Sequence, residues 1–308
     1  DDLRRTFWHT VRTDHPDTLL LRFLRARKWD LPKALAMLVN ALRWQFTENV
    51  DRVIADGEDA IPLNQFESGK TLVRGVDLQG RPVTYVRARF HFKDAQTAEV
   101  NKLFTILTME TVRIMLSPPV ETATMVFDLR GLTMANSDLG TIKFLVGCFE
   151  AFYPESLGKA LIVGAPWIFW GLWRVISPLL DPVVASKICI LKKESELLDY
   201  IAPDQLVSSL GGEDDRPYVY IPPFPEDQMR LQDVTEKERL IELVTEIQGR
   251  LTQATKDWDG SVESPEYHQR MELAEELRRR TLALDPYVRA RVNLHRLDVI
   301  REDGTTDF

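Results

Sequence analysis

The sequence predicts an α/β protein, with a mainly parallel five-stranded sheet that is preceded and followed by helices. Three observations predict this class. Strand-like and helical segments alternate through the middle of the chain, as is typical of parallel sheets. Helical periodicity precedes the first strand, within residues 3–60, and returns within residues 231–308. The 308 residues, 44% hydrophobic and 28% charged, suffice for one large core or two linked units.

The composition argues against several classes of protein. The net charge of −8 argues against a general polyanion binder, so no nucleic-acid partner is expected. Cys148 and Cys189 lie in apolar contexts and are expected to be reduced, buried thiols in a cytosolic protein. The five histidines show no metal-ligand spacing, so no metal is expected. No secretory signal is visible, but the sequence starts at Asp1 without a methionine, so its start says nothing about targeting.

The first predicted helices carry a strongly basic surface. Residues 18–28 place apolar side chains on one helical side and crowd the other with arginine and lysine, including Arg27 and Lys28. Asp30 is placed to cap the next helix, and Pro32 suits its first turn. That next helix carries an apolar stripe about three turns long.

The middle of the chain supplies the strands. The first two predicted strands flank a turn that contains glycine and proline. The five predicted strands are 71–76, 82–87, 123–128, 159–164 and 188–191. Helical patterns cover 97–116 and 137–152, between successive strands. The expected units are therefore an N-terminal helical subdomain, a sheet-containing domain and a C-terminal helical extension, over residues 1–65, 66–225 and 226–308.

The segment between Pro166 and Pro178 is apolar on almost every side. It holds three tryptophans and a phenylalanine but a single charge, Arg174. It is too short to span a bilayer, which needs ~20 apolar residues. Two interpretations stay open. It is a buried core helix, or it is a mobile helix that opens against lipid, where exposing aromatic rings costs little. Acidic and basic residues bracket it, within 153–159 and 181–187.

The tail is predicted to form amphipathic helices. The tail contains three apolar stripes, each of which predicts one helix, and Asp285-Pro286 is expected to start the third helix. The stripes consist of Leu240, Val244, Ile247, Leu251, Ala254 and Trp258; of Tyr267, Met271, Ala274 and Leu277; and of Tyr287, Ala290, Leu294 and Leu297. These helices either pack on the preceding domain or dock onto a partner or a membrane surface.

No sequence motif indicates catalysis. The chain has no Gly-x-Ser-x-Gly elbow, no phosphate-binding Walker loop and no Gly-x-Gly-x-x-Gly pattern. The sequence therefore predicts a protein that is not an enzyme and needs no cofactor.

Seven motifs occur in one order along roughly residues 15–225. They are Leu20–Asp30, Asp77–Val83, Phe127–Gly131, Tyr153–Lys159, Ala165-Pro166, Asp181–Ile188 and Leu210–Gly212. In this order they resemble the CRAL-TRIO lipid-binding family, of the yeast-type phosphatidylinositol/phosphatidylcholine transfer kind. The tail resembles the helical extension of a fungal subgroup.

The resemblance implies a helical cap over a five-stranded floor, with a large apolar cavity closed by a gate helix from Phe169 to Leu180. The expected ligand is phosphatidylinositol. The resemblance implies five residues at its headgroup, namely Arg27, Lys28, Glu155, Asp181 and Lys187. The expected gate and cavity residues are Trp167, Phe169, Trp170, Leu172, Trp173, Ile176, Leu179, Ala123, Met125 and Phe127.

Two features depart from the family pattern. Ala123 and Met125 stand where carriers of phosphatidylcholine place hydroxyl residues. Thr122 and Thr124 are one residue out of phase, so their side chains should point to the other face of the strand. Val184 stands where a threonine often assists the inositol site. Because Ala123 and Met125 leave this face of the strand without hydroxyl groups, we expect the second ligand to be apolar, sterol- or squalene-like, rather than phosphatidylcholine.

The expected protein is a cytoplasmic monomer that visits membrane surfaces transiently and has membrane phospholipid as its partner. Two other functions stay open at this point. One is a lipid-sensing regulatory module that presents phosphatidylinositol to a phosphoinositide kinase or another partner through the C-terminal helices. The other is a lipid hydrolase.

Overall fold

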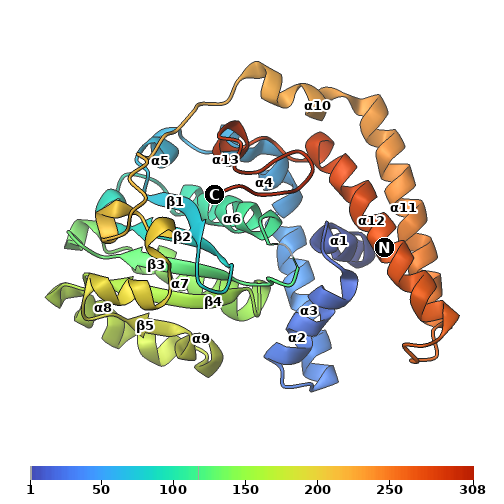
Figure 1. Ribbon diagram of the computed structural model, residues 1–308, viewed down its shortest axis with the longest axis horizontal. Coiled ribbons are helices and arrows are strands. Elements are labelled where there is room, and N and C mark those ends of the chain that lie inside the picture. Colours follow the sequence, from blue (N-terminus) through green and yellow to red (C-terminus); the bar gives the residue numbers. More distant parts are fainter. Residues whose placement is uncertain (1, 117) are drawn as a thin grey trace.

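The computed structural model describes residues 2–116 and 118–308, so the first residue of the expected unit 1–65 lies outside the described residues. The strands are β1 (Thr71–Val76), β2 (Pro82–Arg87), β3 (Ala123–Asp128), β4 (Leu157–Val163) and β5 (Ile188–Ile190). The α-helices are α1 (Asp2–Val11), α2 (Pro16–Ala26), α3 (Leu31–Thr47), α4 (Val50–Asp56), α5 (Asn64–Glu67), α6 (Ala98–Ile114), α7 (Leu139–Gly147), α8 (Trp167–Ile176), α9 (Pro182–Ser186), α10 (Met229–Gln232), α11 (Val234–Asp257), α12 (Pro265–Val288) and α13 (Asn293–Arg296) (Figure 1).

The sheet confirms the predicted fold class. Its strands lie in chain order, β1-β2-β3-β4-β5, with β1 antiparallel to β2 and every later pair parallel. The helical connections from β2 onward therefore each cross to the neighbouring strand. Since such crossovers share one hand, α6, α7 and α8 all lie over the same face of the sheet. The opposite face is left to the chain that follows β5.

Side-chain alternation gives the sheet two different faces. On the first, which we call the solid face, buried residues of β2, β3 and β4 pack against the segment 191–210. The strand residues of the solid face are Val83, Tyr85, Val126, Leu161 and Val163. The other face, which we call the hollow face, turns its side chains toward α6, α7 and α8.

The tail packs on the N-terminal helices. α11 and α12 lie side by side, and the core between them includes Trp8 of α1 (Figure 1). The Arg270 guanidinium on α12 binds both oxygens of Asp17 at the start of α2. Further along, the amide of Ala290 donates to the carbonyl of Ile54 in α4 at 3.0 Å. Of the two interpretations of the tail, packing on the preceding residues is the one observed.

One predicted boundary is wrong, and one predicted helix changes type along its length, each for a local reason. Pro286 does not restart a helix but lies inside α12, two residues before its end. A proline so close to the C-terminus removes one helical hydrogen bond, and packing tolerates that loss. The helix expected over 137–152 ends as an α-helix at Gly147 and continues to Phe152 as a wider π-helical turn.

Candidate functional site

A largely apolar cavity of about 310 Å³ lies between the hollow face and the helices α6, α7 and α8. Its floor consists of alternate strand residues, whose side chains share one face because the strand repeat is two. These floor residues are Thr84, Val86, Ala123, Met125, Phe127, Ala160, Ile162 and Ile188. Thr124, between Ala123 and Met125, points to the opposite side and donates a 2.7 Å hydrogen bond to Asp77. The predicted phase of β3, apolar toward the cavity, is therefore the observed one.

Helix α8 forms one wall of this cavity with half of its apolar residues. Phe169, Leu172, Trp173 and Ile176 recur at helical spacing and line the cavity. The helix starts after Pro166, its N-cap residue, and ends before the Ser177-Pro178 step.

The other half of the aromatic segment faces outward. Trp167 is 84% exposed, Trp170 is 51% exposed, and Leu179 is 53% exposed in the turn that follows. Of the expected gate and cavity residues, these three do not line the cavity in this structure. The reason is helical periodicity, since residues two places before and one place after Phe169 point away from its side. The segment is apolar all round, yet it is not a core helix.

Glu155 and Lys187 come together although 32 residues separate them. Lys187 Nζ lies 3.1 Å from Glu155 Oε2. The two residues precede the adjacent parallel strands β4 and β5, which explains their meeting, because the amino ends of parallel strands share one edge of the sheet. Glu155 and Lys187 do not line the cavity, but the next residues in the chain, Ser156 and Ile188, do, so the ion pair lies beside it.

The backbone at Glu155 is constrained. Its φ of +56° is a left-handed conformation that a residue with a side chain rarely adopts, at a cost of about 1–2 kcal/mol. Such strain persists where the surroundings hold it, and here the turn into β4 does so: the Ser156 hydroxyl donates to the Tyr153 carbonyl at 2.6 Å.

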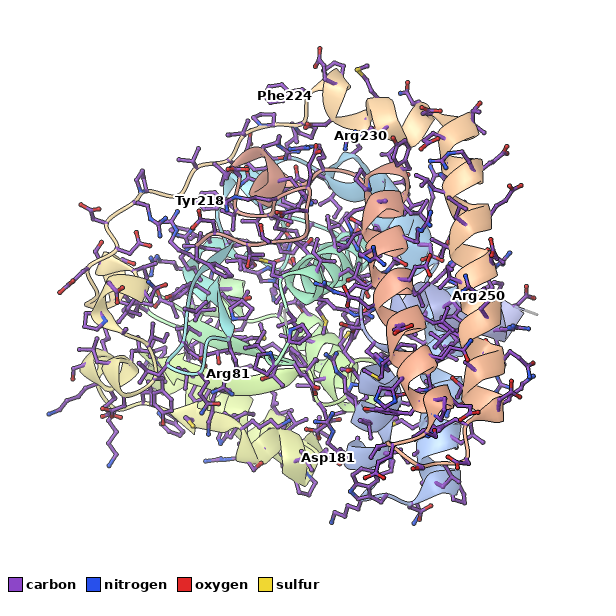
Figure 2. The ribbon with its side chains drawn as sticks, turned by 45° about the vertical axis from the view of Figure 1, so that its right-hand side comes forward. Arg81, Asp181, Tyr218, Phe224, Arg230 and Arg250 are labelled. Atoms are coloured by element: carbon purple, nitrogen blue, oxygen red, sulfur yellow. The ribbon has the colours of Figure 1, made fainter. Side chains whose placement is uncertain are left out.

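The remaining expected headgroup residues are not joined to this pair. Asp181 caps α9 by accepting from the amide of Val183 at 2.8 Å, and Figure 2 shows it at the opposite end of the molecule from Arg230. Arg27 donates to the carbonyl of Ala26, and Lys28 is exposed with a φ of +51°. Across residues 2–116 and 118–308, no hydrogen bond or ion pair links Arg27, Lys28 or Asp181 to Glu155 or Lys187.

The sequence reasoning missed a polar end of the cavity, formed by Lys70, His91, Asn101 and Asp138. The Lys70 side chain is buried; its ammonium donates to the amide oxygen of Gln65 and lies 4.2 Å from the centre of the Phe104 ring. Burial lowers the pKa of Lys70 to about 8.

The other members of the polar end are joined through Asp138. His91 Nε2 lies 3.2 Å from an Asp138 oxygen, and Asn101 donates to the same oxygen at 3.2 Å. Burial also lowers the pKa of His91, which favours its neutral form.

This polar end lies at the carboxyl ends of β2 and β3, whereas Glu155 and Lys187 lie at the amino ends of β4 and β5. Parallel sheets commonly bind ligands beyond their carboxyl ends, and that rule could have directed attention to His91 and Asp138. Lys70 carries no such signal, because nothing in its sequence context distinguishes a buried lysine from a solvated one.

Metal and membrane-spanning features do not appear among the described residues. Within these residues, no three His, Cys, Asp or Glu side chains are grouped so as to hold a metal ion. Every helix of the same residues is too short or too polar to cross a membrane.

Comparisons with known proteins agree with the fold. Residues 66–212 match the model of the CRAL/TRIO domain, and residues 1–40 match that of the CRAL/TRIO N-terminal domain. The chain is 39% identical over 300 residues to "Phosphatidylinositol transfer protein CSR1" of Eremothecium gossypii, covering 93% of this chain and 69% of that protein. It is 37% identical over 308 residues to a CRAL-TRIO domain-containing protein of Schizosaccharomyces pombe, covering 97% and 69% respectively.

A solved structure supports the fold alone. The crystal structure of Sfh5 superimposes with a TM-score of 0.55 at 20% identity, covering 66% of this chain and 73% of that one. The family matches over residues 1–40 and 66–212 and the long alignments to fungal relatives identify the chain: it belongs to the CRAL-TRIO family.

Proposed function

We propose that this protein binds phosphatidylinositol and exchanges it between membranes, without covalent chemistry. The observation that carries the proposal is an acid–base pair, Glu155 and Lys187, whose next residues in the chain line a largely apolar cavity. The relative from Eremothecium gossypii named as a phosphatidylinositol transfer protein supports the same function.

The chemistry of the pair matches an inositol phosphate headgroup. The Lys187 ammonium can donate to a phosphodiester oxygen, and the Glu155 carboxylate can accept from ring hydroxyls. In the structure these two groups neutralise each other at 3.1 Å. A headgroup that inserts between them replaces one ion pair by two charge-assisted contacts, so binding leaves neither charge unpaired.

The acyl chains of the lipid then occupy the apolar cavity. Burial of each CH₂ group is worth about 0.8 kcal/mol relative to water, but the bilayer interior offers nearly the same gain. Exchange between bilayer and cavity is therefore close to balance, as a carrier requires. The headgroup contacts select the lipid.

Helix α8 supplies the contact with the membrane. Its inner side covers the cavity, and its outer side exposes Trp167, Trp170 and Val175. Indole rings favour the boundary between headgroups and acyl chains, and exposed apolar groups of this kind mark interaction surfaces. On a membrane, α8 can move away from the cavity at little cost in free energy, because both of its sides then contact apolar surroundings.

The second ligand in this proposal is sterol-like. A squalene-like hydrocarbon would offer no hydrogen-bonding group to Lys70, His91 and Asn101 at the polar end of the cavity. A ligand with one hydroxyl on a large apolar body can pair with that end and fill the remainder with hydrocarbon. The structure thus favours the sterol-like member of the two expected ligand types.

The regulatory alternative finds less support. The buried stripes of α11 and α12 face each other and α1, so they are not free to present lipid to a kinase. The proposal is therefore a carrier that works as a monomer in the cytoplasm and visits membranes transiently.

Replacing Lys187 with alanine tests the proposal. We expect the transfer of labelled phosphatidylinositol from donor vesicles of phosphatidylcholine to acceptor vesicles to fall about tenfold or more, the loss typical of one charge-assisted contact. Binding of a fluorescent sterol should be unchanged. Lys193→Ala is the matched control, since Lys193 is exposed and lies three residues after β5. Equal transfer by the Lys187 and Lys193 variants would refute the proposed headgroup site.

A further inference from the structure

A second cavity, of about 550 Å³, lies between α2, α12 and the end of the chain. One side is a single face of the α2 region, where His15, Thr18 and Arg22 recur over two helical turns. The facing side is one face of α12, whose residues Arg278 and Leu282 are a helical turn apart. Nothing in the proposed lipid exchange uses this cavity.

Three buried nitrogen donors that lack partners belong to residues lining this cavity. His15 Nε2, Arg22 Nε and Arg289 Nη2 have no hydrogen-bond partner among the described residues. Arg22 is 5% exposed and Arg289 is 4% exposed. His15 Nδ1 accepts from the amide of Asp17 at 3.1 Å, so the ring proton of the neutral form is on Nε2.

A third arginine adds to this set. Arg278 lines the cavity, and in the described part of the chain it forms no hydrogen bond or ion pair. Burying a nitrogen donor without a partner costs about 1–3 kcal/mol, and three such donors around one space call for an acceptor that compensates them.

Most carboxylates of the cavity are already paired with arginines, some of which line the cavity as well. Asp285 accepts from Arg289 Nε at 3.0 Å. The terminal nitrogen Nη2 of Arg289 has no partner among the described residues. Asp227 pairs with Arg291 and Arg296, Glu302 with Arg230 and Arg291, Asp14 with Arg113, and Glu121 with Arg25. The other two, Glu226 and Glu275, are exposed. The buried donors therefore need an acceptor that the lining residues do not supply.

We propose that this second cavity binds a small molecule that carries phosphate groups. Guanidinium groups pair with phosphate oxygens through two parallel hydrogen bonds, and the volume is in the range of small-molecule sites. His15 contributes a neutral donor, which suits a phosphate oxygen as well. The site depends on the tail, because α12 and the C-terminal turn form one side of it.

The site is distinct from the lipid headgroup site. Lys187 and Glu155 do not line the second cavity, whereas Arg22 and Leu116 line both cavities. Lys187→Ala should therefore leave phosphate binding intact, so the two proposals fail or succeed separately.

Isothermal titration of the full chain tests the proposal with three probes, inositol hexakisphosphate, inorganic phosphate and citrate. We expect the hexakisphosphate to bind more tightly than citrate. Arg278→Glu should weaken its binding about tenfold or more, since one attractive charge becomes repulsive. The matched control is Arg279→Glu, the exposed neighbour on α12, which does not line the cavity and should change binding less than about twofold.

Three outcomes would overturn the inference. They are no heat of binding with either phosphate probe, citrate binding as tightly as the hexakisphosphate, or equal weakening by the Arg278 and Arg279 variants. If the Arg278→Glu protein melts below the wild-type protein, Arg278→Gln replaces it. That variant removes the charge but keeps a polar side chain, and it should still weaken binding severalfold.

Discussion

The two faces of the sheet carry the same kinds of strand residue but meet opposite surroundings. On the solid face, Leu161 and Val163 are fully buried against the segment 191–210. On the hollow face, Met125 and Ala160 meet a cavity of about 310 Å³. Both faces are apolar, so hydrophobicity alone does not distinguish a core from a ligand site. The difference is whether another part of the chain fills the space.

That difference is reflected in the elements that cover each face. The crossovers α6, α7 and α8 bridge the space at its edges, while the turns after β5 lie directly on the solid face. Close packing provides dispersion contacts that a hollow lacks. The sheet therefore gains most of its stability from one side and offers the other to a ligand.

The largest expected effect comes from adjacent residues of β4. Leu161→Ala, on the solid face, should lower the free energy of unfolding by about 3–5 kcal/mol, because it leaves a cavity in packed surroundings. Ile162→Ala, on the hollow face, should lower it by about 1–2 kcal/mol, because part of its surface already lacks neighbours. Urea unfolding followed by circular dichroism measures both. Equal losses would mean that the hollow is closed or filled in solution.

A second experiment concerns the buried cation of the hollow side. The pKa of Lys70 is about 8 when folded and about 10.4 when unfolded, so the unfolded chain binds more protons between these values. The contribution of Lys70 to stability is therefore unfavourable below pH 8 and improves as the pH rises toward 10.4.

Lys70→Met should accordingly stabilise the protein at pH 7 by about 1–3 kcal/mol and remove this improvement with pH. Unfolding midpoints measured from pH 7 to 10 check this, with Lys192→Met as the exposed control. A destabilised Lys70→Met protein would show that the ammonium has a stronger partner than Gln65.

The smallest effect concerns two buried threonines that face opposite ways. Thr124 donates to Asp77, so Thr124→Val should cost about 1–2 kcal/mol. Thr84 points into the cavity and, within the described residues, its hydroxyl forms no hydrogen bond, so Thr84→Val should change stability by less than about 0.5 kcal/mol. Thermal unfolding of the two variants measures both losses of stability. A larger loss of stability for Thr84→Val than for Thr124→Val would contradict the assigned faces of the strands.

Much of the fold could be predicted from the sequence, because period-two and helical patterns are local. The bounds of β1, β2 and β3 are the predicted ones, and Glu155 and Lys187 meet because parallel strands align their starts. The outward position of Trp167 could not be predicted. Predicting it requires knowing which side of α8 meets the sheet, and residue types do not indicate that side when every side of the helix is apolar. Lys70 and Arg22 were missed because only tertiary structure shows that they are buried.

The contact between Arg270 and Asp17 joins residues 253 positions apart. Arg296 and Glu58, both buried, make a similar connection over 238 positions. Long-range contacts of this kind form late, since the intervening chain must first become compact. During synthesis, helix α4 can therefore complete the core that it shares with Val292 only after the last helices have been made.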